Sequence, residues 1–329
     1  MNFGDTVSIP GCSLKSRHLE TFSGCTALDA LLGGSVPNTS FVVIDETGSK
    51  TYADVLLRLF AAEGIYAGHD VLYASSPLEA DSLLDRLPAK CENARRNEES
   101  MGHSRGMGGS GDDMQIAWRY APMKTVESSV TKQPSKFDLA TPMPKEVFDQ
   151  SSTTILPFPS TVDEPFTYQT EYAKSKGPRA PGSEKPRLLR VVLRGLGSPL
   201  WEDDQELAAF LTRLPYLIRH SYVVIMATTD TSTMTAELSR QVETTADACL
   251  RLEAMNEAEK KMHDGAHGYL RIVRLPRLTS LAPPVPPSVD LTFELHRRSF
   301  DVKILHLPPA LEDEEKEQSK MGCAVAAQF

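Results

Sequence analysis

Apolar and polar residues in the first 90 positions follow two alternating patterns. Residues 41–44 form a continuous apolar run, which predicts a buried strand, and a second strand is expected over residues 70–74. Between them, apolar side chains recur at the spacing of one helical face, and Gly64 is expected to end that helix. A shorter helix over residues 27–32 should stop at two glycines. Strands that alternate with helices predict a parallel sheet covered by helices.

The second half of the chain extends this pattern. Strands are expected at residues 188–193 and 222–227, with a helix at 202–220 that Pro215 should kink or interrupt. Few helical patterns separate the remaining strand candidates, which suggests an antiparallel edge; they are residues 249–252, 269–275, 291–295 and 302–307. The predicted fold class is therefore α/β, a parallel central sheet with antiparallel C-terminal edge strands.

Composition predicts where this single domain, residues 21–310, is interrupted. Residues 1–20 are polar and irregular and are expected to form a flexible N-terminus. Two stretches should be disordered insertions: the glycine-rich residues 93–114, and about 124–187, which is rich in proline, serine and threonine. One short helix is expected inside the second stretch, around residues 145–150. Residues 311–329 should form an acidic, flexible tail.

The charge balance argues against a free-standing nucleic-acid-binding protein. The chain has 329 residues, of which 40% are hydrophobic and 24% charged, and a net charge of -9. Because an acidic chain repels phosphate, RNA binding would need a local basic patch. Arg274 and Arg277 are the RNA-contact candidates in such a cluster, which also holds Arg271, Arg297, Arg298 and Lys303. Intersubunit salt bridges or a solvated face explain the cluster equally well.

The segment between the first predicted strand and helix lies where a phosphate-binding loop would be. Residues 44–51 read Ile-Asp-Glu-Thr-Gly-Ser-Lys-Thr, so Lys50 and Thr51 occupy the lysine and Ser/Thr positions of the motif. Ile44 and Ser49 stand where the consensus requires glycine, and the acids at 45 and 46 disfavour a triphosphate. ATP binding through Lys50 and Thr51 stays open, but a vestigial loop is the favoured interpretation.

Other parts of a nucleotide-hydrolysing site are also missing from the sequence. The strand candidate at residues 190–195 ends near an arginine, where a metal-binding aspartate would be needed. Ser75 and Ser76 occupy the place of a water-activating glutamate. Histidines and cysteines show no metal-ligand spacing, and no Ser-His-Asp arrangement can be found. We therefore assign no catalytic residue and no metal, and expect a non-catalytic chain.

Two aromatic-flanked positions are candidate interface residues. Arg119, between Trp118 and Tyr120, could enter the nucleotide site of a neighbouring subunit, but stacking at a packed interface is favoured. Trp201 could stack on an exposed base, but a core or subunit contact is favoured. The five cysteines form no CxxC pair, which fits reduced thiols in a cytoplasmic or nuclear protein. No secretory signal or membrane span is expected.

Several segments carry a family resemblance. Residues 21–34 resemble the opening of RecA-family ATPase domains, where a short helix and paired glycines precede the phosphate-loop strand. Further segments, in order along nearly all of the predicted fold, are similar to the Elongator complex protein 4 family: residues 62–65 with 68–70, 116–120, 196–201 with 203–204, 275–278 and 305–309. The glycine-rich 93–114 stretch, a shortened 150–187 segment and a short N-terminal extension depart from the family.

The resemblance implies a RecA-like fold with degenerate Walker motifs. It implies a hetero-hexameric ring with Elongator proteins 5 and 6 that docks on the catalytic subcomplex of proteins 1, 2 and 3 and binds tRNA. The whole assembly installs carboxymethyl-type groups on carbon 5 of wobble uridine, with the chemistry in protein 3. No cofactor is expected in the chain itself, although ATP could bind at ring interfaces. The alternatives are a self-sufficient RecA-type ATPase and an interaction module outside tRNA modification.

Overall fold

The computed structural model describes residues 8–15, 18–47, 51–75, 86–91, 129–157, 186–198, 204–263, 265–277 and 283–305. Its centre is a sheet in which six strands run parallel, and these lie in the order β11 (Ala248–Ala254), β4 (Phe41–Thr47), β10 (Val223–Thr229), β9 (Leu189–Leu196), β5 (Asp70–Ser75) and β8 (Ser152–Pro157). Three antiparallel strands extend the β11 side: β12 (Gly268–Arg274), β13 (Leu291–Leu295) and β14 (Phe300–Ile304).

The strand order identifies the fold. Numbered along the chain, β4, β5, β9, β10 and β11 lie in the order 5-1-4-3-2, which is the arrangement of RecA-type cores. The three antiparallel strands at the C-terminal side complete the predicted architecture. The expected RecA-like α/β fold is therefore confirmed.

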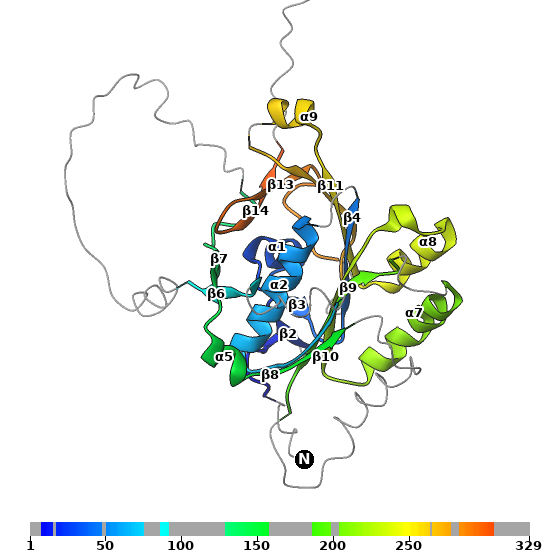
Figure 1. Ribbon diagram of the computed structural model, residues 1–329. Coiled ribbons are helices and arrows are strands. Elements are labelled where there is room, and N and C mark those ends of the chain that lie inside the picture. The colour runs from blue at the N-terminus through cyan, green and yellow to red at the C-terminus, as the bar shows by residue number, and fades with distance from the viewer. Residues whose placement is uncertain are drawn as a thin grey trace, which may run out of the picture.

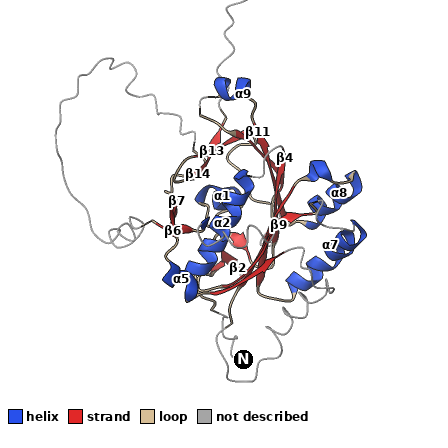
Figure 2. Ribbon diagram, in the orientation of Figure 1, coloured by secondary structure: helices blue, strands red, loops and turns tan. Residues whose placement is uncertain are grey.

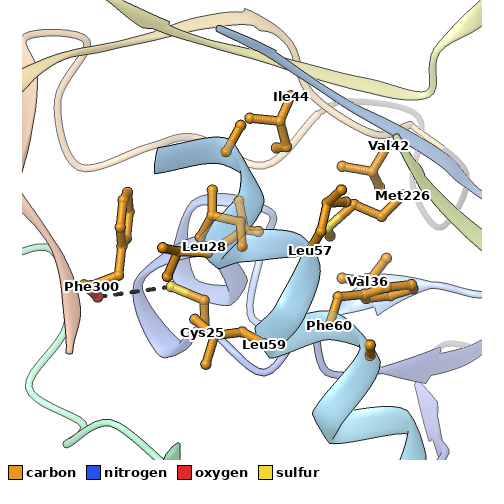
Figure 3. Close-up of a cluster of buried hydrophobic side chains, with 14 of the residues drawn as sticks. Cys25, Leu28, Val36, Val42, Ile44, Leu57, Leu59, Phe60, Met226 and Phe300 are labelled. Carbon is orange, nitrogen blue, oxygen red and sulfur yellow. Dashed lines mark hydrogen bonds between the residues drawn. The ribbon is translucent and has the colours of Figure 1, made fainter. Parts of the chain in front are cut away.

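Helices cover both faces of the sheet (Figures 1 and 2). Helices α1 (Thr26–Leu31) and α2 (Thr51–Tyr66) pack on one face, and α7 (Asp204–Arg219) and α8 (Ala236–Thr245) pack on the other. Because side chains alternate along a strand, Val42 and Ile44 of β4 join the α2 side while Phe41 and Val43 join the α7–α8 side. Figure 3 shows Leu57 and Phe60 of α2 against the strands.

Smaller elements surround this core. The N-terminal segment forms a three-stranded antiparallel sheet of β1 (Ser13–Lys15), β2 (His18–Thr21) and β3 (Val36–Pro37). A two-stranded ladder joins β6 (Pro88–Lys90) to β7 (Phe137–Pro142), and the short helices are α5 (Lys145–Asp149), α9 (Glu257–Met262) and the 3-10 turn η2 (Thr231–Thr233). Within the described ranges, no helix is long and apolar enough to cross a membrane.

Two predicted disordered regions contain ordered structure, so those predictions were wrong in part. Residues 1–20 were expected to be flexible, but Ile9 is buried and residues 13–15 of β1 pair with residues 18–20 of β2. Within 124–187, residues 137–157 form β7, α5 and β8, because alternate apolar side chains such as Phe137 reach the core. The short helix expected at 145–150 is confirmed to within one residue. Residues 93–114 and the tail at 311–329 lie outside the described residues.

Three element predictions also need correction. Gly64 does not end its helix but is buried inside α2, which continues to Tyr66. Pro215 lies within an uninterrupted α7, since buried Leu214 before the proline and buried Ile218 after it hold the helix on the sheet. Residues 249–252 belong to the parallel core, because β11 pairs parallel with β4. The crossover from β10 to β11 contains helix α8, which the sequence analysis missed.

Candidate functional site

The junction between β4 and α2 is where the degenerate phosphate loop was expected. Lys50 lies outside the described residues, as do Gly48 and Ser49, whereas Thr51 is the exposed first residue of α2. The two acids just before Thr47, the last residue of β4, are almost completely buried, with Asp45 0% and Glu46 2% exposed. Since consecutive strand residues face opposite sides of a sheet, these two carboxylates meet different neighbours.

The Glu46 carboxylate caps the N-terminus of α2. Its Oε1 accepts a hydrogen bond from the Tyr52 amide at 3.2 Å, and its Oε2 accepts one from the Ala53 amide at 2.6 Å. These amides belong to the first turn of the helix, where N–H groups have no carbonyl partner within the helix. A carboxylate there also interacts favourably with the helix dipole. Glu46 therefore stabilises the helix end that a phosphate would otherwise contact.

The Asp45 carboxylate lies on the other face of the sheet, against β10 and β11. It accepts hydrogen bonds from the Thr231 amide at 2.9 Å, the Thr231 hydroxyl at 2.7 Å and Arg251 Nε at 2.6 Å. Arg251 also pairs with Glu243 of α8 at 2.8 Å. Burial alone would lower the pKa of Arg251, but its hydrogen bond to Asp45 and the nearby charges raise it. The expectation that Asp45 adds charge beside a bound phosphate was wrong, because Asp45 points away from α2.

An open polar hollow of about 390 Å³ lies beside this junction at the carboxyl ends of β4 and β11. Its lining consists of Thr47, Thr231, Ser232, Arg251, Glu253 and Ala254. Ligands of open α/β sheets generally bind at this edge. The ionic groups here already have partners within the chain, since Arg251 pairs with Asp45 and Glu253 pairs with Arg271 at 2.7 Å.

Among the residues that the structure describes, the carboxyl ends of β9 and β5 hold no acidic side chain where a nucleotide-hydrolysing site would have its metal-binding aspartate and its base. Near the end of β9, Arg194 Nε lies 2.8 Å from Asp54 Oδ1 of α2, and Asp54 also pairs with Arg58 at 3.2 Å. Ser75, the last residue of β5, is buried. Across the described ranges, no three histidine, cysteine or acidic side chains are grouped to hold a metal ion.

The basic cluster is partly occupied by contacts within the chain. Arg274 donates to the carbonyls of Glu243 and Thr244 at the end of α8, whereas Arg277 lies exposed just after β12. Arg298 pairs with Asp138 at 3.6 Å and Lys303 with Glu294 at 2.7 Å. RNA binding by Arg274 and Arg277 stays a prediction. The interface candidates Arg119 and Trp201 lie outside the described residues.

The sequence analysis missed a polar cluster buried beneath α2. Arg190 of β9 is 0% exposed and donates to His69 Nδ1 at 2.9 Å, to the Phe60 carbonyl at 3.1 Å and to Thr21 Oγ1 at 2.6 Å. Burial lowers the pKa of Arg190 to about 10, so it stays charged at neutral pH. Burial and the Arg190 charge lower the pKa of His69 to about 4. A charged residue inside an apolar strand was the available signal.

The neutral imidazole of His69 links Arg190 to the N-terminal segment. With its Nδ1 accepting from Arg190, His69 carries its proton on Nε2, which lies 2.7 Å from the Pro10 carbonyl. Thr21 makes a parallel link, since its hydroxyl donates to the Gly11 carbonyl at 3.2 Å. The cluster therefore joins β9, α2 and the N-terminal segment, and its role is structural.

Comparison with known proteins gives a consistent picture over the whole chain. The family model described as PAXNEB protein matches residues 6–328. Elongator complex protein 4 of Homo sapiens is 29% identical, covering 98% of this chain and 85% of that protein. The Xenopus laevis protein of the same name is 28% identical, covering 99% and 89%, and that of Schizosaccharomyces pombe is 29% identical, covering 93% and 89%. Among solved structures, a KaiC-like protein of Pyrococcus horikoshii OT3 has a TM-score of 0.47 at 15% identity, covering 86% of this chain and 98% of that one.

Proposed function

Because the chain belongs to the PAXNEB family, we propose that it is a non-catalytic subunit of an Elongator complex. The observation that carries the proposal is the similarity to proteins named Elongator complex protein 4 along almost the full length of both chains. The geometry of the site supports the non-catalytic part. Glu46 occupies the helix end where a phosphate would bind, and the end of β9 carries Arg194 in place of a metal-binding aspartate.

In this proposal the subunit contributes to the carboxymethyl-type modification of wobble uridine at carbon 5 without performing the chemistry. It acts in the cytoplasm and nucleus within a hetero-hexameric ring formed with Elongator proteins 5 and 6. The ring joins the catalytic proteins 1, 2 and 3 and holds tRNA. Arg277, exposed after β12, and the neighbouring Arg274 are the tRNA contacts, while Arg119 and Trp201 serve at subunit interfaces. Any ATP binds between subunits.

Nucleoside mass spectrometry of tRNA tests the proposal. Cells that lack the gene should lose the carboxymethyl-derived wobble uridines, and the wild-type gene should restore them. Genes carrying Lys50→Ala or Thr51→Ala should restore them equally well, because the proposed role does not use this loop for nucleotide. Unchanged modification in the deletion strain would contradict membership of an Elongator complex. Failure of the Lys50→Ala gene alone would instead favour an ATPase that uses the loop.

Charge reversal at the exposed arginine tests the tRNA contact separately. Arg277→Glu should weaken tRNA binding by the purified assembly, because a phosphate contact is replaced by repulsion. The matched control is Arg187→Glu, which changes the net charge equally at a residue outside the basic cluster that pairs with Asp70 at 3.5 Å. Equal losses for both variants would mean that net charge, and not the position after β12, determines binding.

A further inference from the structure

The N-terminus of α2 has the features of an anion site, but the anion is a side chain of the protein. The helix is 16 residues long and directly follows β4, which lies inside the parallel core. Backbone amides at such a position commonly bind phosphate groups. Here the two oxygens of Glu46 each accept one amide hydrogen bond, from Tyr52 and Ala53. The carboxylate thus presents two oxygens to the first turn, as a phosphate group would.

We propose that Glu46 is a built-in occupant of the anion position at the N-terminus of α2, which closes these helix amides to phosphate groups. A phosphate group approaching these amides would have to displace the Glu46 carboxylate. Glu46 is only 2% exposed and belongs to the strand that directly precedes the helix. If the Glu46 carboxylate and the phosphate group both stayed, about 4 Å apart, their repulsion energy would be several times RT even near a protein surface. The contact therefore blocks an anion site that the fold itself provides.

The surrounding structure keeps Glu46 in place. The backbone at Glu46 is in register with Leu252 of the adjacent parallel strand β11. On the opposite face, the preceding residue Asp45 is held by Thr231 and Arg251. Since β4 is held at its edge by pairing with β11 and on one face by the contacts of Asp45, a simple shift of the strand cannot carry Glu46 away from the helix amides. This inference concerns the chain alone and does not depend on membership of an Elongator complex.

Thermal unfolding of the purified full chain with inorganic phosphate as the probe tests the proposal. Glu46→Ala frees the two amides, so its Tm in chloride should fall by several degrees below that of the wild type. Replacing chloride by phosphate at matched ionic strength should restore a large part of that loss. Phosphate stabilises most proteins non-specifically, so the relevant quantity is the extra gain of the variant over the wild type.

Glu253→Ala is the matched control, because it removes a carboxylate from the neighbouring hollow without exposing helix amides. Its gain in phosphate should equal that of the wild type. The proposal is overturned if Glu46→Ala gains no more than Glu253→Ala, or if the wild type gains as much as Glu46→Ala. If Glu46→Ala does not fold, Glu46→Gln replaces it in the test. Its uncharged amide oxygen can keep only part of the cap, so a smaller extra gain in Tm in phosphate is expected. No extra gain over the wild type would refute the proposal.

Discussion

Helix α2 is held by a charged side chain at its N-terminus and by another in its second half, and the two charges have opposite signs and come from different parts of the fold. At the N-terminal end, Glu46 of the preceding strand binds the first free amides. Toward the C-terminal end, the Arg190 guanidinium of β9 reaches the Phe60 carbonyl and His69. The negative charge of Glu46 matches the helix dipole, which favours anions at the start of a helix. Phe60 lies inside α2, before its last turn, so Arg190 acts there through its hydrogen bonds.

The two contacts of α2 differ in how far apart their partners lie along the chain. The N-terminal contact is local, since Glu46 lies only six and seven residues before its partners. The Arg190 contacts are long-range and connect positions 121, 130 and 169 residues apart. A local cap affects one helix end, whereas the long-range cluster ties three segments together. We therefore expect perturbations near Arg190 to have larger effects on stability.

The largest effect is expected for Arg190→Met. Replacing a buried charge with an apolar group can be neutral when no partner is left behind. Here three acceptors remain buried without their donor, on His69, Phe60 and Thr21, so we expect a loss of about 3 kcal/mol or more in the free energy of unfolding. Urea unfolding measures this value. Arg271→Met, at an exposed ion pair, should change it by less than about 1 kcal/mol.

A second prediction uses the titration of His69. Its pKa is lowered from 6.5 to about 4 by burial and by Arg190, so the unfolded chain binds the proton more readily than the folded protein. The contribution of His69 is therefore complete above pH 6.5 and is lost as the pH falls toward 4, by up to about 3 kcal/mol. His69→Gln should be less sensitive to acid over this range. An unchanged pH dependence of unfolding would contradict the assignment.

Asp29 supplies a control, because its contribution to stability changes with pH in the opposite direction to that of His69. Burial raises the pKa of this carboxyl from 3.8 to about 7, so its contribution is complete below pH 3.8 and is lost as the pH rises through 7. Between pH 4 and 6.5 it therefore opposes the His69 effect. Asp29→Asn keeps an oxygen that can accept from the Ser23 amide, which donates to Oδ1 at 2.7 Å. This variant should lose more stability on acidification than the wild type, whereas His69→Gln should lose less.

Gly64 gives a third prediction, because it provides the space that Arg190 needs. A Cβ at this position would lie 2.6 Å from Arg190 Cδ and 3.0 Å from Val71 Cγ2. Alanine is better than glycine inside a helix by about 1 kcal/mol. We expect the overlap to outweigh this gain, so that Gly64→Ala loses about 1–2 kcal/mol. The penalty should shrink when Arg190→Ala is combined with it in a double-mutant cycle, and a stabilised Gly64→Ala protein would contradict the close packing.

The sequence analysis predicted the main strands and helices because their apolar periodicity is strong. It missed α8, in which only Leu238 and Val242 are buried among polar residues, and therefore placed β11 in the antiparallel edge. At the site, Ile44 in place of glycine already showed a changed phosphate loop. Alternation along β4 could also have placed Asp45 and Glu46 on opposite faces, but the hydrogen bonds of Glu46 depend on the three-dimensional position of α2. The Arg190 cluster depends on contacts that no local pattern encodes.

The smallest effect is expected for Arg194→Gln, four residues beyond Arg190 on the same strand. The Arg194 side chain is 23% exposed and pairs with Asp54, which also pairs with Arg58 at 3.2 Å. In the variant, Asp54 would keep its favourable interaction with the helix dipole at the first turn of α2. The loss in the free energy of unfolding should therefore stay below about 1 kcal/mol. Urea unfolding beside Arg190→Met makes the comparison direct, because both variants remove one arginine from β9. Equal losses would show that burial beneath α2 is not what gives Arg190 its importance, and the contrast between the Glu46 and Arg190 contacts of the helix would then no longer hold.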